Sequence, residues 1–373
     1  MKVPYKSISN SNESELYLFF VCLLLSIFVK LFLKLLSRLN RKITKFIDLH
    51  FHLDGSITVE IAKKLAELQN INLEVKNDLE LESKLSVQEN CQSLNDFLGC
   101  FPLPLSLLQT KEGLTESIKL TAENISSQGV IYAEIRFAPQ LHKEKGMSQE
   151  DAVKAALKGL QRIKDNKIPI KVNLILCFMR GNDTKAENEE TLRLAKKYLV
   201  EDGGVVAVDL AGAEAIFPTS DYKSLFTKAK KYGIPFTIHA GEADGPESVR
   251  TAIEFGAKRI GHGTRAYKDK SVVELIKEKG IFLEMCPTSN KQTHAIESIK
   301  EFPFMDYLKQ GIKVTLNTDD MGIEGTTLQK EFELMEREFK LNYEEEKSIL
   351  LNSVNAAFTS DKVKDELKRQ LDL

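Results

Sequence analysis

The stretch FIDLHFHLDGSI, residues 46–57, places two of the six histidines of the chain one residue apart within an apolar run. In an extended strand, successive side chains point to opposite faces, so His50 and His52 face the same side of the strand. Two imidazoles on one face, followed at once by Asp54, are typical of half a metal site at a strand end. For an isolated pattern of this kind, a pair of hydrogen-bonded histidines in a half-buried strand is the alternative interpretation.

The elements that would position these residues follow a regular order. From about residue 43, short apolar and β-branched runs of strand length alternate with longer segments of helical periodicity, among them 148–165, 186–200, 219–232, 245–255 and 270–279. The runs are eight in number: KFIDLHFH, GVIYAEIRF, IKVNLILCFM, GVVAVDLAG, IPFTIHAG, AKRIGHG, IFLEMCP and IKVTLNTDD. Alternating strands and helices imply a parallel sheet, and eight units favour an α/β fold of the closed (β/α)8 TIM barrel type over an open doubly wound sheet.

The connection between the first and second expected strands is much longer than one crossover helix requires, since it runs from about Thr58 to Gln128. Its middle contains the apolar, phenylalanine-bearing sequence LNDFLGCFPLPLSLLQT. We therefore predict a helical insertion between strand 1 and strand 2, on the catalytic face of the barrel. Two interpretations stay open: the insertion covers the pocket, or its helices only pack against the outer ring.

The remaining candidates for chemistry share one position, because each stands where an expected strand ends and a loop begins. They are Gly212 in DLAGAE, His239 and Glu242 in HAGE, His262 in GHG, and Asp319 and Asp320 in NTDD. In a barrel of this type, the carboxyl ends of the strands build the active site. We therefore expect four of the histidines, two aspartates and a glutamate to converge on one face. His142 and His294 lie in loop-like sequences, and we predict no role in chemistry for them.

Imidazoles combined with one carboxylate, and no thiolate, form the ligand set of a catalytic zinc site that leaves room for a water molecule. Such an ion lowers the pKa of its water to about 7. The five cysteines are widely spaced and never form CxxC, which argues against a thiolate site or a disulfide framework and fits a reducing compartment. Glu242, three residues beyond His239, is well placed to move a proton without binding the metal.

Taken in order, DLHFHLDGSI, DLAGAE, HAGE, GHGTR and LNTDD resemble the adenosine deaminase family of metal-dependent amidohydrolases over about residues 41–373. The resemblance implies zinc-dependent hydrolysis of adenosine and 2′-deoxyadenosine to inosine and 2′-deoxyinosine, with release of ammonia, in purine salvage. It implies one Zn2+ per chain, with the ligands His50, His52, His239 and Asp319. Two departures from the family pattern, Ala213 for an acidic residue and Met321 for a proline, remove no group that the mechanism uses.

The same resemblance implies a role for each remaining residue of the set. Glu242 would donate a proton to purine N1, and His262 would orient the attacking water and help to deprotonate it. The residues expected to meet the purine nucleoside are His52, Asp54, Gly212 and Asp320. Asp320 would hydrogen-bond N7, the Gly212 backbone would meet N3, and Asp54 would contact the ribose 5′-hydroxyl. Attack at C6 makes a tetrahedral centre that loses ammonia, and protonation of N1 lets the ring accept that attack.

Other functions stay open on the sequence alone. Nucleic-acid deaminases of the cytidine type carry a PCxxC motif that is absent here, and two-metal amidohydrolases use a lysine where strand 4 ends. An adenine deaminase, which tends to carry glutamate at the position of Asp54, or another purine deaminase of the family is the main alternative. AMP deaminases are longer and carry basic groups for the phosphate. A barrel that binds nucleosides without turning them over is the second alternative.

The composition limits the partners of the protein. Its net charge of −2 comes from 52 basic and 54 acidic residues spread along the chain, without a dense basic patch and interleaved aromatics, so we expect no nucleic-acid partner. We expect two parts, an N-terminal extension of residues 1–40 and a catalytic domain of residues 41–373. A monomer is the expected oligomeric state.

The extension is unlike the rest of the chain. Residues 16–29 are apolar apart from one serine, and three cations follow at helical spacing: Lys30, Lys34 and Arg38. We therefore expect a hydrophobic helix outside the barrel. Three interpretations stay open: a membrane tether that makes contact through residues 16–36 and leaves the catalytic domain in the cytoplasm, a signal peptide, or an upstream extension wrongly included in the gene.

Overall fold

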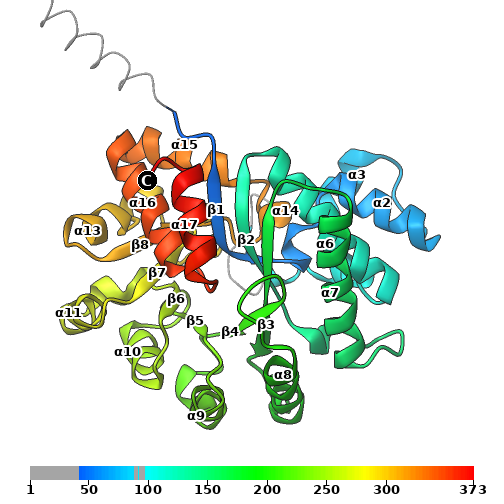
Figure 1. Cartoon of the computed structure of the whole chain (residues 1–373), viewed down its shortest axis with the longest axis horizontal. Helices are drawn as coiled ribbons and strands as arrows, with labels where there is room; N and C mark the ends of the chain where they lie inside the picture. Colours follow the sequence, from blue (N-terminus) through cyan, green and yellow to red (C-terminus); the bar gives the residue numbers. More distant parts are fainter. Residues whose placement is uncertain (1–41, 88–90, 92–96) are drawn as a thin grey trace, which may run out of the picture. The chain divides into compact units, whose positions relative to one another are not determined.

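Eight parallel strands lie at the centre of the computed structural model, which describes residues 42–87, 91 and 97–373. One sheet contains, in the order of pairing, β1 (Phe46–His52), β2 (Val130–Phe137), β3 (Lys171–Met179) and β4 (Val205–Ala211). A second sheet contains, again in order, β5 (Thr237–Ala240), β6 (Arg259–His262), β7 (Phe282–Met285) and β8 (Lys313–Leu316). Each of the eight predicted runs therefore contains one strand, and Figure 1 shows these strands surrounded by helices.

Isolated parallel bridges connect the two sheets at both edges. Val208 of β4 pairs with Phe236, just before β5, and the N–H of Val208 donates to the carbonyl oxygen of Pro235 at 3.1 Å. At the other edge, Phe51 of β1 pairs with Asp319, which follows β8. This is the order of strands that a closed eight-stranded barrel requires, and parallel strands place all their carboxyl ends on one side.

The helices that follow the strands begin and end where local sequence signals place them. Helix α7 (Gln149–Asp165) starts after Ser148, which forms a capping box with Asp151. Helix α11 (Lys270–Lys279) ends at Gly280, whose φ of +62° a glycine adopts without strain. The helices predicted at 148–165, 186–200, 245–255 and 270–279 are confirmed to within two residues. The others after β3 are α8 (Lys185–Tyr198), α9 (Lys223–Lys231), α10 (Pro246–Phe255), α12 (Pro287–Gln292), α13 (Phe304–Lys309), α14 (Met321–Glu324), α15 (Leu328–Phe339), α16 (Tyr343–Ala356) and α17 (Asp361–Gln370).

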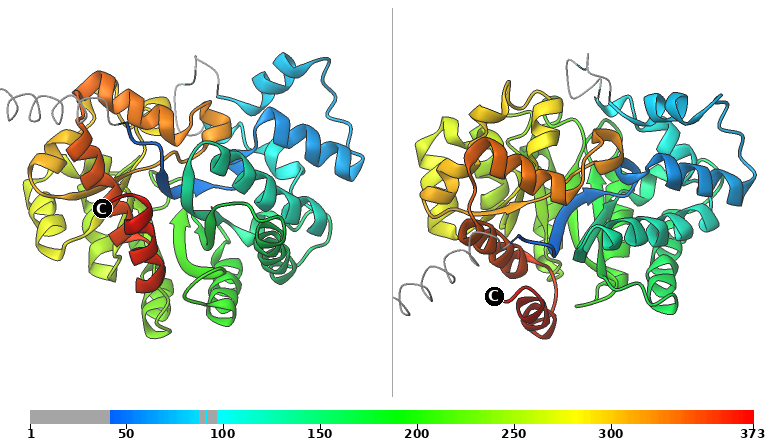
Figure 2. Two further views of the ribbon diagram at one scale, coloured as in Figure 1. Left: turned by 45° about the horizontal axis from the view of Figure 1, so that its top comes forward. Right: turned by 90° about the horizontal axis from the view of Figure 1, so that it is seen from above.

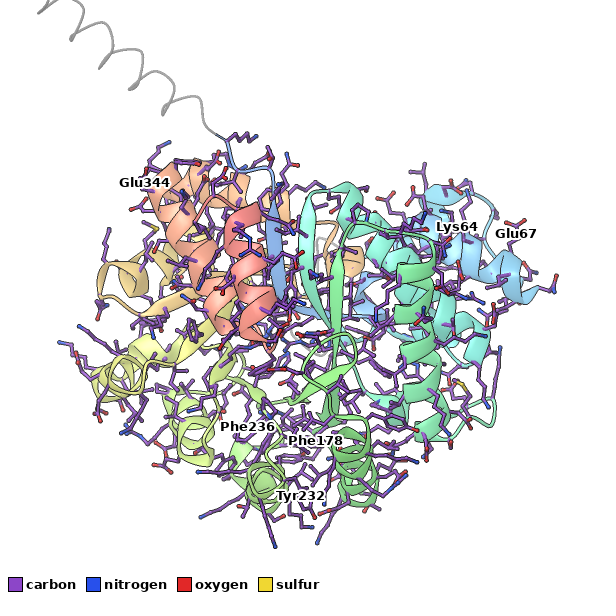
Figure 3. All side chains as sticks on the ribbon, viewed as in Figure 1. Lys64, Glu67, Phe178, Tyr232, Phe236 and Glu344 are labelled. Atoms are coloured by element: carbon purple, nitrogen blue, oxygen red, sulfur yellow. The ribbon has the colours of Figure 1, made fainter. Side chains whose placement is uncertain are left out.

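Aromatic side chains fill the layer between the strands and the outer helices. The ring of Phe226 in α9 lies 5.7 Å, between centroids, from Phe178 of β3 and 4.9 Å from Phe236. In Figure 3, Phe178 and Phe236 lie on the inner side of α9, whereas Tyr232, just after this helix, lies at the outside. Burying one such ring contributes roughly 1.5–3 kcal/mol, so this layer holds the helices against the sheet.

The described part of the connection between β1 and β2 is helical, with α2 (Val59–Gln69), α3 (Asp78–Leu85), α5 (Pro102–Ser106) and α6 (Lys111–Ser127). Helix α6 packs closely on α7, because a Cβ built on Gly159 would lie only 2.6 Å from the Cβ of Ile118. Figure 2 shows the blue and cyan helices α2 and α3 gathered beside α6. Helix α6 thus occupies the place of the crossover helix, and the other three are additional.

The expected hydrophobic helix, its membrane contact through residues 16–36 and the extension as a whole lie outside the described residues. Across residues 42–87, 91 and 97–373, no helix is long and apolar enough to cross a membrane. The three interpretations given for the N-terminus therefore stay predictions.

Candidate active site

The four side chains predicted to bind a metal come together at the carboxyl ends of β1, β5 and β8. The Nε2 atom of His239 lies 3.1 Å from Nε2 of His50 and 3.2 Å from Nε2 of His52. The Oδ1 atom of Asp319 lies 3.2 Å from Nε2 of His50 and 3.5 Å from Nε2 of His52. The pairing of β1 with the segment after β8 produces this approach, since the N–H of Asp319 donates to the carbonyl oxygen of His50 at 2.8 Å.

Buried carboxylates set the tautomers of two of these histidines. Oε2 of Glu284 in β7 lies 2.7 Å from Nδ1 of His50, and Oδ2 of Asp209 in β4 lies 2.8 Å from Nδ1 of His239. A carboxylate beside Nδ1 holds a proton there, which leaves the Nε2 lone pair facing the centre of the cluster. Metal-binding imidazoles in proteins are commonly oriented in this way.

Asp319 completes a set that fits a cation. Its Oδ2 accepts a hydrogen bond from Oγ of Ser289 at 2.7 Å, whereas its buried Oδ1 has no hydrogen-bond partner among the described residues. A buried carboxylate oxygen without a partner is costly unless a cation or a donor meets it. Three imidazole nitrogens and one carboxylate oxygen, with no thiolate, are a donor set that suits zinc. The residues therefore fit the metal that the sequence predicts.

His262 offers a second way to complete the cluster, because its donor atom and those of His50, His239 and Asp319 all lie within 4.8 Å of one another. However, Nδ2 of Asn290 donates to Nδ1 of His262 at 3.0 Å, so the proton of the neutral ring lies on Nε2. This Nε2 atom lies 3.5 Å from Oε2 of Glu242 and 3.8 Å from Oδ2 of Asp319. Since a protonated nitrogen cannot be a ligand, the hydrogen bonds favour His52 as the third imidazole of the metal site.

The backbone is strained at two of these positions. The φ angles of Asp319 and His262 are +76° and +62°, in a region that residues other than glycine seldom adopt. Such strain persists only where the surroundings fix it, and it concentrates at functional sites. The neighbouring Gly261 has no room for a side chain, because a Cβ there would lie 2.9 Å from Cε1 of His50.

Three buried carboxyl groups beside the cluster hold their protons more tightly than they would in water. Burial raises the pKa of Glu242, and the charge of Asp319 adds to this rise. The same two causes raise the pKa of Asp320 well above its ordinary value, while burial raises the pKa of Asp54 to about 6. Gly55 makes room for Asp320, since a Cβ there would lie 1.6 Å from Oδ1 of that aspartate. Glu242 and Asp320 are therefore the candidate proton donors of the site, whereas Asp54 is still mainly ionised at neutral pH.

A pocket opens onto the cluster and has two kinds of wall. Its apolar lining comes from the ends of β2, β3 and β4 and from the insertion: Phe97, Leu98, Phe101, Leu105, Ala138, Leu141, Cys177, Met179 and Ala211. Its other lining residues come mainly from the ends of β1, β5, β6 and β8, with Gly212 after β4 and Thr293 after α12: His52, Asp54, Gly212, His239, Glu242, His262, Thr293, Asp319 and Asp320. Of the two interpretations of the insertion, the one in which it covers the pocket agrees with this lining. His142 and His294 are not among the lining residues.

The sequence did not reveal the residues that orient the side chains of the site through hydrogen bonds and ion pairs. The guanidinium of Arg136 in β2 bridges two carboxylates, with Nη1 2.9 Å from Oδ2 of Asp209 and Nη2 3.0 Å from Oε2 of Glu284. Ser289 and Asn290, which orient Asp319 and His262, were also missed. A charged residue inside an apolar strand was the available signal, because a buried charge needs a partner.

Comparison with known families matches residues 46–373 to the adenosine deaminase family model. The chain belongs to the adenosine deaminase family. It is similar to an adenosine deaminase of Haemophilus ducreyi, with 47% identity over 322 residues that cover 86% of this chain and 94% of that relative. An adenosine deaminase of Clostridium botulinum is 41% identical over 332 residues, which cover 89% of this chain and 99% of the relative.

Solved structures of purine deaminases share the fold of this adenosine deaminase family member. An adenine deaminase from Arthrobacter aurescens superposes with a TM-score of 0.79 at 25% identity and covers 88% of this chain and 98% of its own. An N6-methyl-AMP deaminase from Arabidopsis thaliana gives a TM-score of 0.75 at 28% identity, with 88% of this chain and 96% of its own covered. The protein is thus a hydrolase of the adenosine deaminase family with an α/β fold of parallel strands.

Proposed function

We propose that this hydrolase is a zinc-dependent adenosine deaminase, which converts adenosine and 2′-deoxyadenosine to inosine and 2′-deoxyinosine with release of ammonia, in purine salvage. The observation that carries the proposal is the convergence of three imidazole nitrogens and the unpaired Oδ1 of Asp319 beside the buried carboxyl of Glu242. The adenosine deaminases of Haemophilus ducreyi and Clostridium botulinum, at 47% and 41% identity, support the choice of substrate.

The chemical roles follow from the protonation states of the side chains. His50, His52, His239 and Asp319 would hold one Zn2+, and the chemistry that this ion would supply is a nucleophilic water at neutral pH. Glu242 donates a proton to purine N1, because its raised pKa favours the protonated carboxyl. The N–H at Nε2 of His262 orients the attacking water. The predicted help of His262 in deprotonation additionally needs the Asn290 amide to turn, so that its oxygen accepts from Nδ1.

The remaining pocket residues suit a purine nucleoside without a phosphate. Asp320, kept protonated by its raised pKa, donates to the N7 acceptor, and the backbone of Gly212 meets N3. Asp54, next to the ligand His52, accepts a hydrogen bond from the 5′-hydroxyl and repels a 5′-phosphate. Among the described residues that line the pocket, none is a lysine or an arginine, so a phosphate would find no cationic partner.

We also propose the finer architecture that the sequence predicts. It is a closed (β/α)8 barrel with α2, α3 and α5 as the helical insertion, in a catalytic domain of residues 41–373 that follows an extension of residues 1–40. The bridges at both sheet edges support the closure. A monomeric state, a cytoplasmic location and membrane contact through residues 16–36 stay predictions.

A panel of four purines tests the proposed reaction. Ammonia release from adenosine, 2′-deoxyadenosine, adenine and AMP gives kcat/KM for each, and the two nucleosides should be the good substrates. A site built around a substrate hydroxyl rejects analogues that lack it by a factor on the order of 10⁴, so adenine should be poor. Adenine or AMP as the best substrate would place the chain with another purine deaminase. Binding of adenosine without ammonia release would favour a barrel that does not turn nucleosides over.

Two further measurements test the metal and the role of Asp54. Metal analysis of the purified protein should give one zinc per chain, and two equivalents, or none after zinc-replete expression, would contradict the single site. Asp54→Ala should reduce the preference for adenosine over adenine and leave the zinc content unchanged. An unchanged preference would show that Asp54 does not contact the sugar.

A further inference from the structure

A single buried carboxylate holds the loop that carries Glu242. Glu214, two residues beyond Gly212 and only 2% exposed, reaches across to the chain just after β5. Its Oε1 accepts hydrogen bonds from the N–H of Gly241 at 2.7 Å and from Oγ of Ser248 at 2.6 Å. Its Oε2 accepts from three successive backbone N–H groups, those of Glu242 at 3.0 Å, Ala243 at 2.8 Å and Asp244 at 3.0 Å. The carboxylate therefore accepts five hydrogen bonds, four of them from consecutive backbone N–H groups.

The backbone conformation of this loop suits a negative charge at Glu214. Four consecutive N–H groups that point to one spot form a concave anion site, which an ionised oxygen pair fills. Gly241 provides the turn, with a φ of +73°. Burial opposes ionisation of Glu214, but the charge of Arg180 and these hydrogen bonds lower the pKa of the carboxyl below its ordinary value. The acceptor is thus a carboxylate, whose hydrogen bonds are stronger than those of a neutral group.

The same network reaches the metal ligand at the start of the loop. Nη2 of Arg180, at the end of β3, donates to the carbonyl oxygen of His239 at 2.6 Å and to Oγ1 of Thr219 at 3.0 Å. Oγ1 of Thr219 in turn lies 2.7 Å from Oγ of Ser248, which donates to Glu214. A continuous network of hydrogen-bonded side chains therefore binds the backbone at both ends of the segment from residue 239 to residue 244.

We propose that Glu214 is a positioning residue for the proton transfer, which fixes the carboxyl of Glu242 against the purine ring through the loop backbone. The proposal deepens the proposed function and rests on it. The backbone of Glu242 belongs to the loop that Glu214 holds, so the position of its side chain in the pocket depends on the loop. Its Oε2 atom lies 3.5 Å from Nε2 of His262. Displacing a catalytic group by about 1 Å costs on the order of a hundredfold in rate, so a loosened loop should act on turnover. Asp54 and Asp320, two of the proposed substrate contacts, lie after β1 and β8 and outside this loop, so the effect on binding should be smaller than the effect on turnover.

Two substitutions at this position test the proposal in the zinc-loaded enzyme. Glu214→Gln replaces one acceptor oxygen by an NH2 group that faces donors, so kcat for adenosine should fall by at least about tenfold while KM changes by less than about threefold. Zinc content should match that of the parent. Glu214→Asp keeps the charge but shortens the side chain by one methylene group. Its kcat should lie between the kcat of Glu214→Gln and that of the parent. Glu346→Gln, which alters another buried carboxyl group, in α16 and outside the pocket lining, is the matched control and should keep the parental kcat and KM.

The outcomes separate positioning from a merely structural role. A parental kcat per bound zinc in Glu214→Gln would overturn the proposal, and so would a loss of zinc in proportion to the loss of activity. If Glu214→Gln does not fold, Glu214→Asp decides alone, and a fall in kcat at constant KM and zinc content supports the proposal. The parent itself tests the proposed function: absence of ammonia release from adenosine would refute the reaction, whereas an active parent with a fully active Glu214→Gln would refute only the role of Glu214.

Discussion

The strands make two different walls of one pocket: β2 to β4 contribute the apolar wall together with the insertion, whereas β1, β5, β6 and β8 contribute most of the polar wall. Strands β1 to β4 contain seven, eight, nine and seven residues, whereas β5 to β8 contain four residues each. The long strands β2, β3 and β4 end in small or apolar lining residues, among them Ala138, Cys177 and Ala211. Among the short strands, β5 and β6 carry His239 and His262 at their carboxyl ends, and Asp319 lies three residues after β8. The apolar binding surface thus comes from β2 to β4 and the insertion, whereas the chemical groups come from β1 and from the short strands β5, β6 and β8.

Three strand ends of the polar wall share a backbone feature. The chain leaves β5, β6 and β8 with positive φ at Gly241, His262 and Asp319, so backbone and side-chain polar groups turn toward the pocket at once. The opposite wall offers few polar atoms, which lowers the local dielectric constant and strengthens the interactions of the charged wall. The apolar wall therefore contributes to catalysis without supplying a reacting group.

The largest effect should come from removing a metal ligand of the polar wall. His239→Ala deletes one of the converging nitrogens and leaves Asp209 without its histidine, so zinc and activity should be lost together. Metal analysis and ammonia release on the same samples measure both. His142→Ala is the control, because this buried histidine donates to the carbonyl oxygen of Leu108 and does not line the pocket. Retention of zinc by His239→Ala would mean that another residue of the cluster is the ligand.

Loss of the proton donor should have the next largest effect. Glu242→Gln keeps the shape of the side chain but cannot deliver a proton to N1, so kcat should fall by at least about a hundredfold. Zinc content should stay near that of the parent, since Glu242 is not in the proposed ligand set. A variant that keeps most of its activity would show that the proton comes from elsewhere.

A substitution in the apolar wall should act on binding rather than on turnover. Phe101→Ala removes an aromatic ring that the insertion contributes to the pocket, so KM for adenosine should rise by up to about tenfold, with a smaller change in kcat. Steady-state kinetics at saturating and limiting adenosine separate the two constants. A large fall in kcat at unchanged KM would break the division between the two walls.

The smallest effect should be on the stability of the fold, and it concerns Glu331, which does not line the pocket. Burial raises the pKa of Glu331 to about 7, and its carboxyl accepts hydrogen bonds from Oγ1 and N of Thr288 in α12. Because the folded state holds this proton more tightly than the unfolded state, its contribution to stability is present below about pH 4.5 and is lost as the pH rises to about 7. Glu331→Gln should lose this pH dependence, a difference of at most about 3 kcal/mol.

Denaturant unfolding of parent and variant at pH 5 and pH 8 measures this difference. The free energy of unfolding of the parent should fall more between the two pH values than that of Glu331→Gln. Parallel pH dependence in the two proteins would show that Glu331 titrates in the same range whether the chain is folded or not.

Much of this site could be predicted because the chemistry coincides with strand ends. The sequence alone predicts the eight strands and the gathering of His50, His239 and Asp319, because parallel strands place their carboxyl ends together. Boundaries were accurate where a cap marks them, as at Ser148 and Gly280. The segment 219–232 is an exception, since it begins as a 3-10 turn and becomes helix only at Lys223.

The supporting residues could not be predicted because their partners are distant in the sequence. Nothing in DLAGAE shows that Glu214 meets the backbone after β5, nor does IFLEMCP show that Glu284 faces His50. The choice between His52 and His262 as ligand depends on the tautomer that Asn290 imposes, which requires coordinates. Likewise, the sequence does not show that Phe97, Leu98, Phe101 and Leu105 of the insertion line the pocket.

Because β1 pairs with the segment after β8, the proposed cation site can form only after the last strand has been synthesised. His52 N–H donates to the carbonyl oxygen of Asp319 at 2.9 Å, so the earliest and the latest ligands along the chain share one hydrogen-bonded seam. A growing chain that has not yet reached Asp319 has the three imidazole ligands but lacks the carboxylate ligand, and β1 lacks the partner that closes the strand order. The complete ligand set therefore exists only once translation has passed the last strand, and an ion bound there joins the beginning of the domain to its end.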